Sequence, residues 1–184
     1  MSLTPTASMP ATWSDRAMAG DDVSFQAIVE RHQSMVFSIA WHALGNDAAA
    51  EEVAQDVFLR LYRNLGAIES EDHLKFWLRR VTTNRVIDEA RKRRHVIVSL
   101  DDVPELVDDC PAGDPLLSKR LRELVRTLPM PQRLVVTLRY QEELVPKEIA
   151  RVLEMPLNTV RSHLRRALAA LREALEDVME GSES

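Results

Sequence analysis

The sequence predicts an all-α protein with two small helical domains, joined by an acidic flexible linker, the second domain containing a helix-turn-helix. Apolar residues recur at helical spacing in two blocks, residues 23–95 and 115–178. Between the blocks, residues 96–114 are rich in Asp and Pro, which predicts the linker. Five glycines and 5% aromatic residues are too few to favour a turn-rich sandwich or barrel. A chain of 184 residues accommodates two small domains.

The composition excludes several classes of protein. The single cysteine, Cys110, allows neither an internal disulfide nor a thiolate zinc cluster. No apolar run approaches the roughly 18 residues that are needed to span a bilayer. Residues 1–20 lack both the basic and the apolar segment of a secretory signal. We therefore expect a cytoplasmic protein that does not insert into a membrane.

The net charge of −5 is unevenly distributed along the chain. Residues 96–118 carry six acidic and no basic residues, whereas residues 119–178 carry 12 basic and eight acidic residues. The average charge would argue against nucleic-acid binding. The local basic excess is the better guide to possible partners.

Three helices are expected in the first domain, after a disordered leader at residues 1–22. The first helix has Asp21 or Asp22 as its cap, and Gly45 starts the turn that ends it. Its apolar face consists of Phe25, Ile28, Val29, Met35, Val36 and Ile39. The three helices are placed at residues 23–44, 48–64 and 72–94.

The second helix has two contrasting faces. Its apolar side consists of Ala50, Val53, Ala54, Val57 and Leu61. Its outer side consists of Glu51, Glu52, Gln55, Asp56 and Leu59. Glu52 and Asp56 are four residues apart and repel each other, and an apolar side chain lies among these acids. The outer face fits a docking surface for a basic partner, or an ordinary solvated surface in which Asp56 pairs with Arg60.

The third helix is strongly basic, with eight basic and two acidic residues between Lys75 and Arg94. Cations near a helix C-terminus are favourable, but four in a row exceed what capping needs. We therefore favour a phosphate-binding surface over capping alone. The candidate contacts are Lys75, Arg79, Arg80, Arg85, Arg91, Lys92, Arg93 and Arg94.

Two polar residues of this helix are assigned to its interior. Asn84 and Asp88 project on nearly the same side as Trp77 and Val81. We therefore expect both to be buried and hydrogen-bonded rather than in contact with DNA.

The second domain is expected to contain four helices, followed by a tail at residues 179–184. Asp114-Pro115 supplies a cap and a first-turn signal for the first of them, and Asn158 is the expected cap of the last. The predicted helices span residues 116–128, 131–140, 146–153 and 158–178.

The last two helices have the spacing of a helix-turn-helix, based on Ile149, Ala150, Leu153, Val160 and Leu164. One side of the fourth helix carries Val160, Leu164, Ala167, Leu168, Leu171 and Leu175. The other side carries Arg161, Ser162, Arg165 and Arg172, with Thr159 at the tip. A helix with this division suits the DNA major groove. An ordinary helical hairpin with a solvated basic face would show the same pattern.

Nothing in the sequence indicates an enzyme or a bound cofactor. The chain lacks a Gly-rich phosphate loop and any Ser/His/Asp or Cys/His arrangement at a recognisable spacing. Single, scattered histidines are expected to be surface or partly packed residues rather than metal ligands: His32, His42, His73, His95 and His163.

Three ordered motif blocks in this chain resemble the extracytoplasmic-function (ECF) sigma factors of the sigma-70 family. The segment DAAAEEVAQDVF at residues 47–58 looks like the family's polymerase-binding helix, with Glu52 where Asp is commoner. A second block looks like the family's −10 promoter segment and consists of Phe76, Trp77, Leu78, Asn84, Asp88 and Arg91. A third block looks like the family's −35-binding domain and consists of Leu128, Pro129, Arg133, Glu148, Ile149, Ala150, Thr159, Val160, Ser162, Arg166 and Ala167.

The resemblance implies a promoter-specificity subunit with a region 2-like domain at 23–95 and a region 4-like domain at 115–178. It implies that Glu51, Glu52, Gln55, Asp56 and Leu59 face the β′ clamp helices of core RNA polymerase. It implies that the basic third helix binds the −10 element, and that the −35 element is bound by Lys147, Thr159, Arg161, Ser162, Arg165 and Arg166. It further implies control by an anti-sigma factor.

Some residues depart from the family pattern, and two rival functions remain. Glu154 stands where the family often has Gly in the helix-turn-helix turn, and a positive φ there would cost Glu on the order of 1 kcal/mol. Pro146 lies in an unusual entry to the motif, and Asn158 replaces a common Gly. One rival is a stand-alone helix-turn-helix regulator that binds duplex DNA without polymerase. The other is a helical interaction protein with no DNA activity, which would show no salt-dependent DNA binding.

Overall fold

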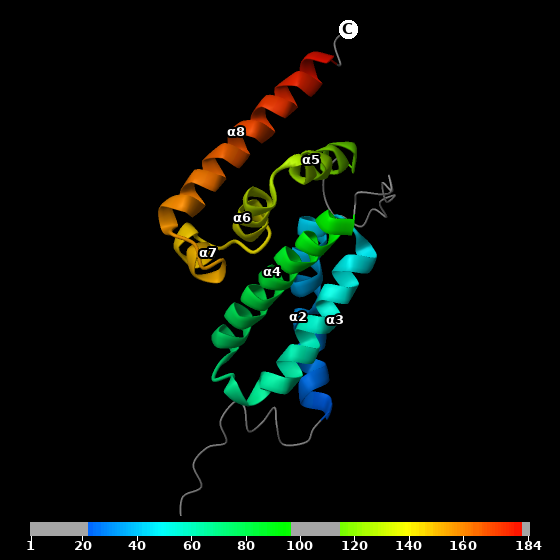
Figure 1. The fold of residues 1–184 in the computed structure, drawn as a ribbon, viewed down its shortest axis with the longest axis vertical. Coiled ribbons are helices and arrows are strands. Elements are labelled where there is room, and N and C mark those ends of the chain that lie inside the picture. The colour runs from blue at the N-terminus through cyan, green and yellow to red at the C-terminus, as the bar shows by residue number, and fades with distance from the viewer. Residues whose placement is uncertain (1–21, 97–114, 182–184) are drawn as a thin grey trace, which may run out of the picture.

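The computed structural model describes residues 22–96 and 115–181. Both ranges are helical, which confirms the all-α prediction for this part of the chain (Figure 1). The first range contains α2 (Asp22–Leu44), α3 (Asp47–Asn64), the short 3-10 helix η1 (Leu65–Ala67) and α4 (Glu71–Val96). The second contains α5 (Pro115–Thr127), α6 (Met130–Tyr140), α7 (Pro146–Val152) and α8 (Leu157–Gly181). Among the described helices, none has the length and apolar character needed to cross a membrane.

Local signals explain the sharp turn between α2 and α3. Gly45 has a φ of +66°, a conformation that glycine adopts without strain, and its N–H donates to the Trp41 carbonyl at 2.8 Å. The Asn46 side chain then accepts the Ala49 N–H at 2.8 Å and caps α3. Asp22 lies inside α2 and is therefore not its cap, while Asp21 is outside the described residues. The end of one helix and the start of the next are thus encoded by neighbouring residues.

The first domain packs α2, α3 and α4 around one apolar core. Its fully buried side chains include Val36, Ile39, Val53, Val57, Leu61, Leu74, Leu78 and Val86. Burying each such aliphatic side chain contributes about 1.5–3 kcal/mol of transfer free energy. The helices that contribute the largest apolar faces therefore meet in the centre of this domain.

The burial prediction for α4 is wrong. Asn84 and Asp88 are exposed, and the buried stripe instead contains Leu74, Leu78, Thr82, Val86 and Glu89. The Thr82 hydroxyl donates to the Leu78 carbonyl at 2.7 Å, so this polar side chain is buried with its hydrogen-bond donor paired. A helical wheel groups residues that share a side, but the packing against α2 and α3 selects which side is buried.

The helix-turn-helix is formed as predicted by α7 and α8. Ile149, Val152 and Val160 are buried where the two helices meet. The turn between them places Glu154 at a φ of +52°, so a glutamate occupies a left-handed position. Helix α8 begins at Leu157, with Pro156 accepting the first N–H bonds, so Asn158 lies within the helix rather than capping it. It continues to Gly181, beyond the predicted end at residue 178.

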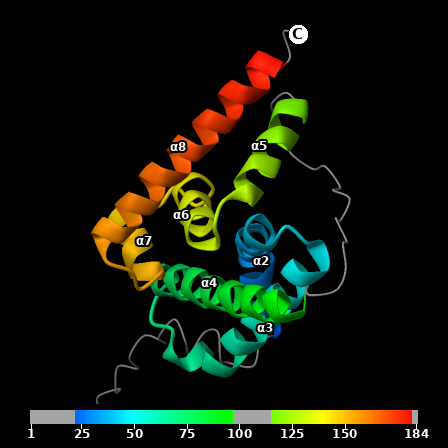
Figure 2. The same cartoon turned by 45° about the horizontal axis from the view of Figure 1, so that its top comes forward.

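The two domains pack against each other. Helix α6 lies against α2, and α7 lies against α4, while α8 extends away from the first domain (Figure 2). The buried core that contains Val36 and Ile39 continues into Leu134 and Leu138 of α6. Apolar surface from both domains is therefore removed from water where they meet. Residues 1–21 of the predicted leader, residues 97–114 of the predicted linker and residues 182–184 of the predicted tail lie outside the described residues. The other residues of these predicted segments are helical: residue 22 belongs to α2, residue 96 to α4 and residues 179–181 to α8.

Candidate functional site

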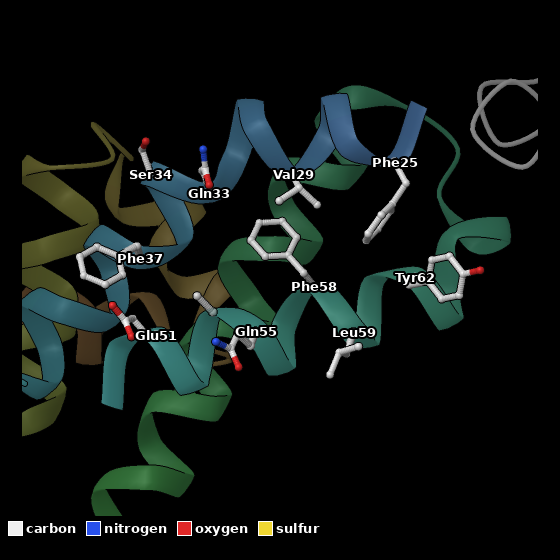
Figure 3. Close-up of a pocket in the computed structure, with 11 residues that line it drawn as sticks. Phe25, Val29, Gln33, Ser34, Phe37, Glu51, Gln55, Phe58, Leu59 and Tyr62 are labelled. Carbon is white, nitrogen blue, oxygen red and sulfur yellow. The ribbon is translucent and has the colours of Figure 1, made fainter. Parts of the chain in front are cut away.

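An apolar groove of about 880 Å³ runs between α2 and α3 (Figure 3). Residues from both helices line it, and Figure 3 shows Val29 of α2 next to Phe58 of α3 between the two helices. The apolar and aromatic lining consists of Phe25, Val29, Phe37, Ala54, Phe58, Leu59 and Tyr62. Tyr62 and Leu59 are 65% and 57% exposed, which is high for large apolar side chains. A contiguous apolar surface of this kind is typical of a docking site.

Three of the five predicted polymerase-binding residues border this groove. Glu51, Gln55 and Leu59 line it, and Glu52 is exposed next to Glu51 on the same helix. Asp56 differs, because its carboxylate forms an ion pair with Arg85 of α4 and lies 3.1 Å from the Arg60 Nε. Four of the five predicted residues therefore lie together on the exposed face of α3. The fifth, Asp56, is instead paired with cations of the same domain.

Sequence analysis missed the aromatic part of the groove. Phe25 and Val29 belong to the predicted apolar face of their helix, and the structure shows them half-buried at the lining of the groove. Ala54 was assigned to the buried face of its helix and is also half-buried there. The available signal was the excess of apolar residues in α2, which are too many for one face that packs against the core.

All the predicted cations of α4 whose side chains are described lie beside a carboxylate. Lys75 is 3.9 Å from Glu71 on the same helix. Near the end of the helix, Arg91 is 4.0 Å from Asp88, while Lys92 and Arg93 lie 3.8 Å and 3.0 Å from Glu89. These pairs are local, and Arg91 and Lys92 remain largely exposed to solvent. The Arg94 side chain is outside the described part of the structure.

Three other cations of α4 make contacts outside their own helix. The Arg79 Nε donates to the Glu142 carboxylate at 2.9 Å, and Arg80 bonds to the Glu154 carboxylate. Arg85 forms an ion pair with Asp56 of α3, and its side chain is only 12% exposed. The predicted basic surface is thus already partly neutralised by acids from α3 and from the second domain.

The predicted −35-binding residues lie together around α7 and the start of α8. Lys147, Arg161, Arg165 and Arg166 are exposed, while Thr159 and Ser162 are half-buried. Among the described residues, none of these four cations forms an ion pair. Their positive charge therefore remains available to a phosphate or a base edge.

The core-facing side of α8 is narrower than predicted. Ala167 and Leu171 are buried, but Leu168 is 42% exposed. It borders an apolar cavity of about 360 Å³, together with Leu121 of α5 and Tyr140 of α6. The prediction that Leu168 faces the core is therefore only partly met, because α5 and α6 do not close over this position.

The histidines are not gathered into a metal site. Among the described residues, no group of three or more His, Cys, Asp or Glu side chains could hold a metal ion. His32 is buried rather than at the surface, with its Nε2 3.2 Å from Glu71, and burial lowers its pKa although this carboxylate opposes the shift. Burial lowers the pKa of His42 to about 4, and Arg122 and Arg126 act in the same direction. The side chain of His95 is outside the described residues.

Further contacts join the two domains. Arg133 of α6 donates to the backbone carbonyl of Ala43 near the end of α2, and also to the Leu128 carbonyl at 3.0 Å. The Arg126 guanidinium lies 5.4 Å from the centre of the Trp41 ring, and Arg151 lies 5.1 Å from that of Phe76. Several arginines therefore hold the second domain against α2 and α4.

Comparison with known proteins places both domains in one family. The sigma-70 region 2 model matches residues 28–96, and the sigma-70 region 4 model matches residues 118–171. The ECF RNA polymerase sigma factor SigE of Mycolicibacterium smegmatis is 32% identical, over 94% of this chain and 68% of its own length. SigW of Bacillus subtilis, also an ECF RNA polymerase sigma factor, is 29% identical over 86% of this chain and 92% of its own length.

Solved structures show the same fold. The sigma factor RpoE of Bartonella quintana, in complex with the anti-sigma factor NepR, matches with a TM-score of 0.71 at 21% identity, over 83% of this chain and 96% of that one. CnrH in complex with the cytosolic domain of CnrY matches with a TM-score of 0.65 at 22% identity, over 89% and 95%. Two domain models in the expected order and a relative above 30% identity show that the chain belongs to the ECF sigma factors of the sigma-70 family, which are regulators of promoter-specific transcription rather than enzymes.

Proposed function

We propose that the groove between α2 and α3 is the surface that binds core RNA polymerase, through its β′ clamp helices. In this assignment, residues 23–95 bind polymerase and the −10 element, residues 96–114 connect the domains, and residues 115–178 bind the −35 element. The protein acts in the cytoplasm, and an anti-sigma factor is a second expected partner, because the similar sigma factor RpoE was solved in complex with one.

The composition of the groove is the observation that carries this proposal. Leu59 and Tyr62 are exposed at its edge, although burying such side chains is favourable. Glu51 and Glu52 add negative charge beside it, and no cation is paired with either among the described residues. A partner helix with apolar and basic side chains would match both properties, which is why we assign the groove to protein rather than to DNA.

A charge-reversal variant tests the assignment. Combining Glu51→Lys, Glu52→Lys and Leu59→Ala should weaken core polymerase binding by at least about thirtyfold, because hot-spot residues contribute roughly 2 kcal/mol or more. All three side chains are exposed, so helicity and thermal stability should stay unchanged. Fluorescence anisotropy against core polymerase measures binding, and circular dichroism checks the fold.

Asp56 is deliberately left out of this variant. Because Asp56 contacts Arg60 and Arg85, reversing its charge would disturb the packing of α3 on α4 as well as any interface. The matched control is Glu173→Lys with Glu176→Lys, two exposed acids on α8. Equal polymerase affinity for the groove variant and this control would remove the groove from the interface.

Transcription in vitro separates a sigma factor from a stand-alone helix-turn-helix regulator. Discrete transcripts that require both this protein and core polymerase are expected. Their start sites would also reveal the −10 and −35 sequences. Tight duplex binding by the protein alone, with no transcripts, would instead support the regulator.

A further inference from the structure

The apolar groove between α2 and α3 ends close to the first residue of α2. Helix α2 begins at Asp22, and Phe25, only three positions later, already lines the groove. The rings of Phe25 and Tyr62 meet edge to face, with their centroids 5.3 Å apart. Figure 3 shows both side chains at the same end of the groove. Residues 1–21 are therefore covalently attached beside the end of an open apolar surface.

The sequence of residues 1–21 contains side chains that suit this surface. Tryptophan is among the residues that contribute most to binding at interfaces. Methionine makes favourable contacts with aromatic rings, which are abundant in the groove. The larger apolar residues of the segment include Leu3, Met9, Trp13 and Met18. The segment that precedes α2 thus matches the apolar lining of the groove.

The length of the segment also fits the groove. From Phe25 to Phe37 the groove follows α2 for about 18 Å, because an α-helix rises about 1.5 Å per residue. Trp13 precedes Asp22 by nine residues, and nine residues span up to about 30 Å when they are extended. If the segment runs back along α2, Trp13 reaches every part of the groove.

A second copy of the chain would fit the groove less well. A symmetric dimer places the same face of both chains in contact. Glu51 and Glu52 are both exposed at this face of α3, so like charges would meet across such an interface. A segment of the same chain that carries few charges avoids this repulsion.

We propose that residues 1–21 fold back over the groove in the free protein, with Trp13 inserted between α2 and α3, and that core polymerase must displace them. This regulation rests on the proposed role of the groove in binding polymerase. A segment that is tethered beside its site has a local concentration on the order of millimolar. A contact that would be weak between separate molecules therefore occupies the groove within one chain.

The charges explain why polymerase can displace this segment. Residues 1–21 contain a single basic residue, Arg16, and two acidic residues. They match the apolar part of the groove, but not the negative charge of Glu51 and Glu52 beside it. A partner helix with apolar and basic side chains matches both, and it therefore binds more tightly than the segment does.

NMR spectra of the full chain test the contact directly. Trp13→Ser removes an aromatic ring from the groove, and should shift the amide resonances of Phe58, Leu59 and Tyr62 while those of α7 stay unchanged. In the reciprocal experiment, Leu59→Asp should shift the indole N–H resonance of Trp13. Leu59 is 57% exposed, so this change tests the surface without disturbing the core.

The matched control changes the neighbours of Trp13 and keeps its ring. Thr12→Ala with Ser14→Ala should leave the groove resonances at their wild-type positions. Circular dichroism checks that helicity is the same in all variants.

Trp13→Ser should also strengthen the binding of core polymerase, because the groove is then open in more of the molecules. If the segment covers the groove in about four-fifths of the molecules, its release lowers the apparent dissociation constant about fivefold. Anisotropy titrations with core polymerase measure this gain, and the Thr12→Ala, Ser14→Ala control should bind as the wild type does.

Failure of this proposal is distinct from failure of the proposed function. Unchanged groove resonances in Trp13→Ser would overturn it, and shifts that grow with protein concentration would assign the groove to a second copy instead. Groove shifts without a gain in polymerase affinity would overturn the inhibition alone, provided that the Glu51→Lys, Glu52→Lys, Leu59→Ala variant still loses affinity. If that variant and Trp13→Ser both bind polymerase as the wild type does, the groove is not the polymerase surface, and the inhibition fails with it.

Discussion

Helices α4 and α8 are both rich in arginine, but they differ in how many of these side chains are paired with carboxylates. The described cations of α4 all lie beside carboxylates, and Arg79, Arg80 and Arg85 reach acids outside their helix. On α8, Arg161, Arg165 and Arg166 are exposed, and none has an ion pair among the described residues. A count of basic residues would rate α4 as the stronger DNA-binding helix. Availability of the charge, rather than its amount, distinguishes the two.

The difference follows from where each helix lies in the fold. Helix α4 contacts α2, α3 and α7, so acids from several elements can reach it. Helix α8 contacts α5, α6 and α7 on one side and extends away from the first domain (Figure 1). We therefore expect α8 to bind duplex DNA without rearrangement, while the cations of α4 divide into exposed and structural groups.

The largest expected effect concerns the open cations of α8. Arg161→Ala combined with Arg165→Ala should weaken binding to a −35 duplex by about a hundredfold, because each good contact to a base contributes roughly 1–3 kcal/mol. Stability should not change, since both side chains are exposed. Anisotropy titrations on the mapped promoter measure the affinity. Arg172→Ala, further along the same helix, is the control, and equal affinities for the two variants would contradict the assignment.

A smaller effect is expected at the most buried cation of α4. Arg85→Ala should lower the free energy of unfolding by about 2 kcal/mol, because it removes one of the two cationic partners of Asp56, and this side chain is only 12% exposed. Urea denaturation measures this loss. The exposed Arg91→Ala is the matched control, with an expected change below about 0.5 kcal/mol. Unchanged stability for Arg85→Ala would show that this cation is not structural.

The smallest expected effect concerns the exposed end of α4. Arg91 is 76% exposed and only 4.0 Å from Asp88, so its pairing is weak and a phosphate can replace it. With polymerase bound, Arg91→Ala should weaken DNA binding a few-fold and reduce the salt dependence by about one unit of slope. Arg63→Ala, on the exposed side of α3, serves as the comparison. An unchanged slope would exclude a phosphate contact by Arg91.

Most helices could be predicted from the sequence because their signals are local. Helix α6 was expected at residues 131–140 and spans Met130–Tyr140, between a proline and a polar turn. The buried stripe of α4 and the aromatic groove were not predicted. Asn84 shares a side with Trp77, yet it is exposed while Trp77 packs against the core, since the neighbouring helices cover only part of that side. Phe25 packs against the core and also lines the groove, and hydrophobicity alone cannot distinguish a core face from a docking face.

By itself the sequence determined the helices, their order, the helix-turn-helix and the family resemblance, because periodicity, caps and motif spacing act within a few turns of chain. Tertiary structure decided which cations stay available and where the groove opens. Arg79 and Glu142 are 63 positions apart, and Arg80 and Glu154 are 74 apart. Such pairs arise only when folding brings distant helices together, and no local pattern records that distance.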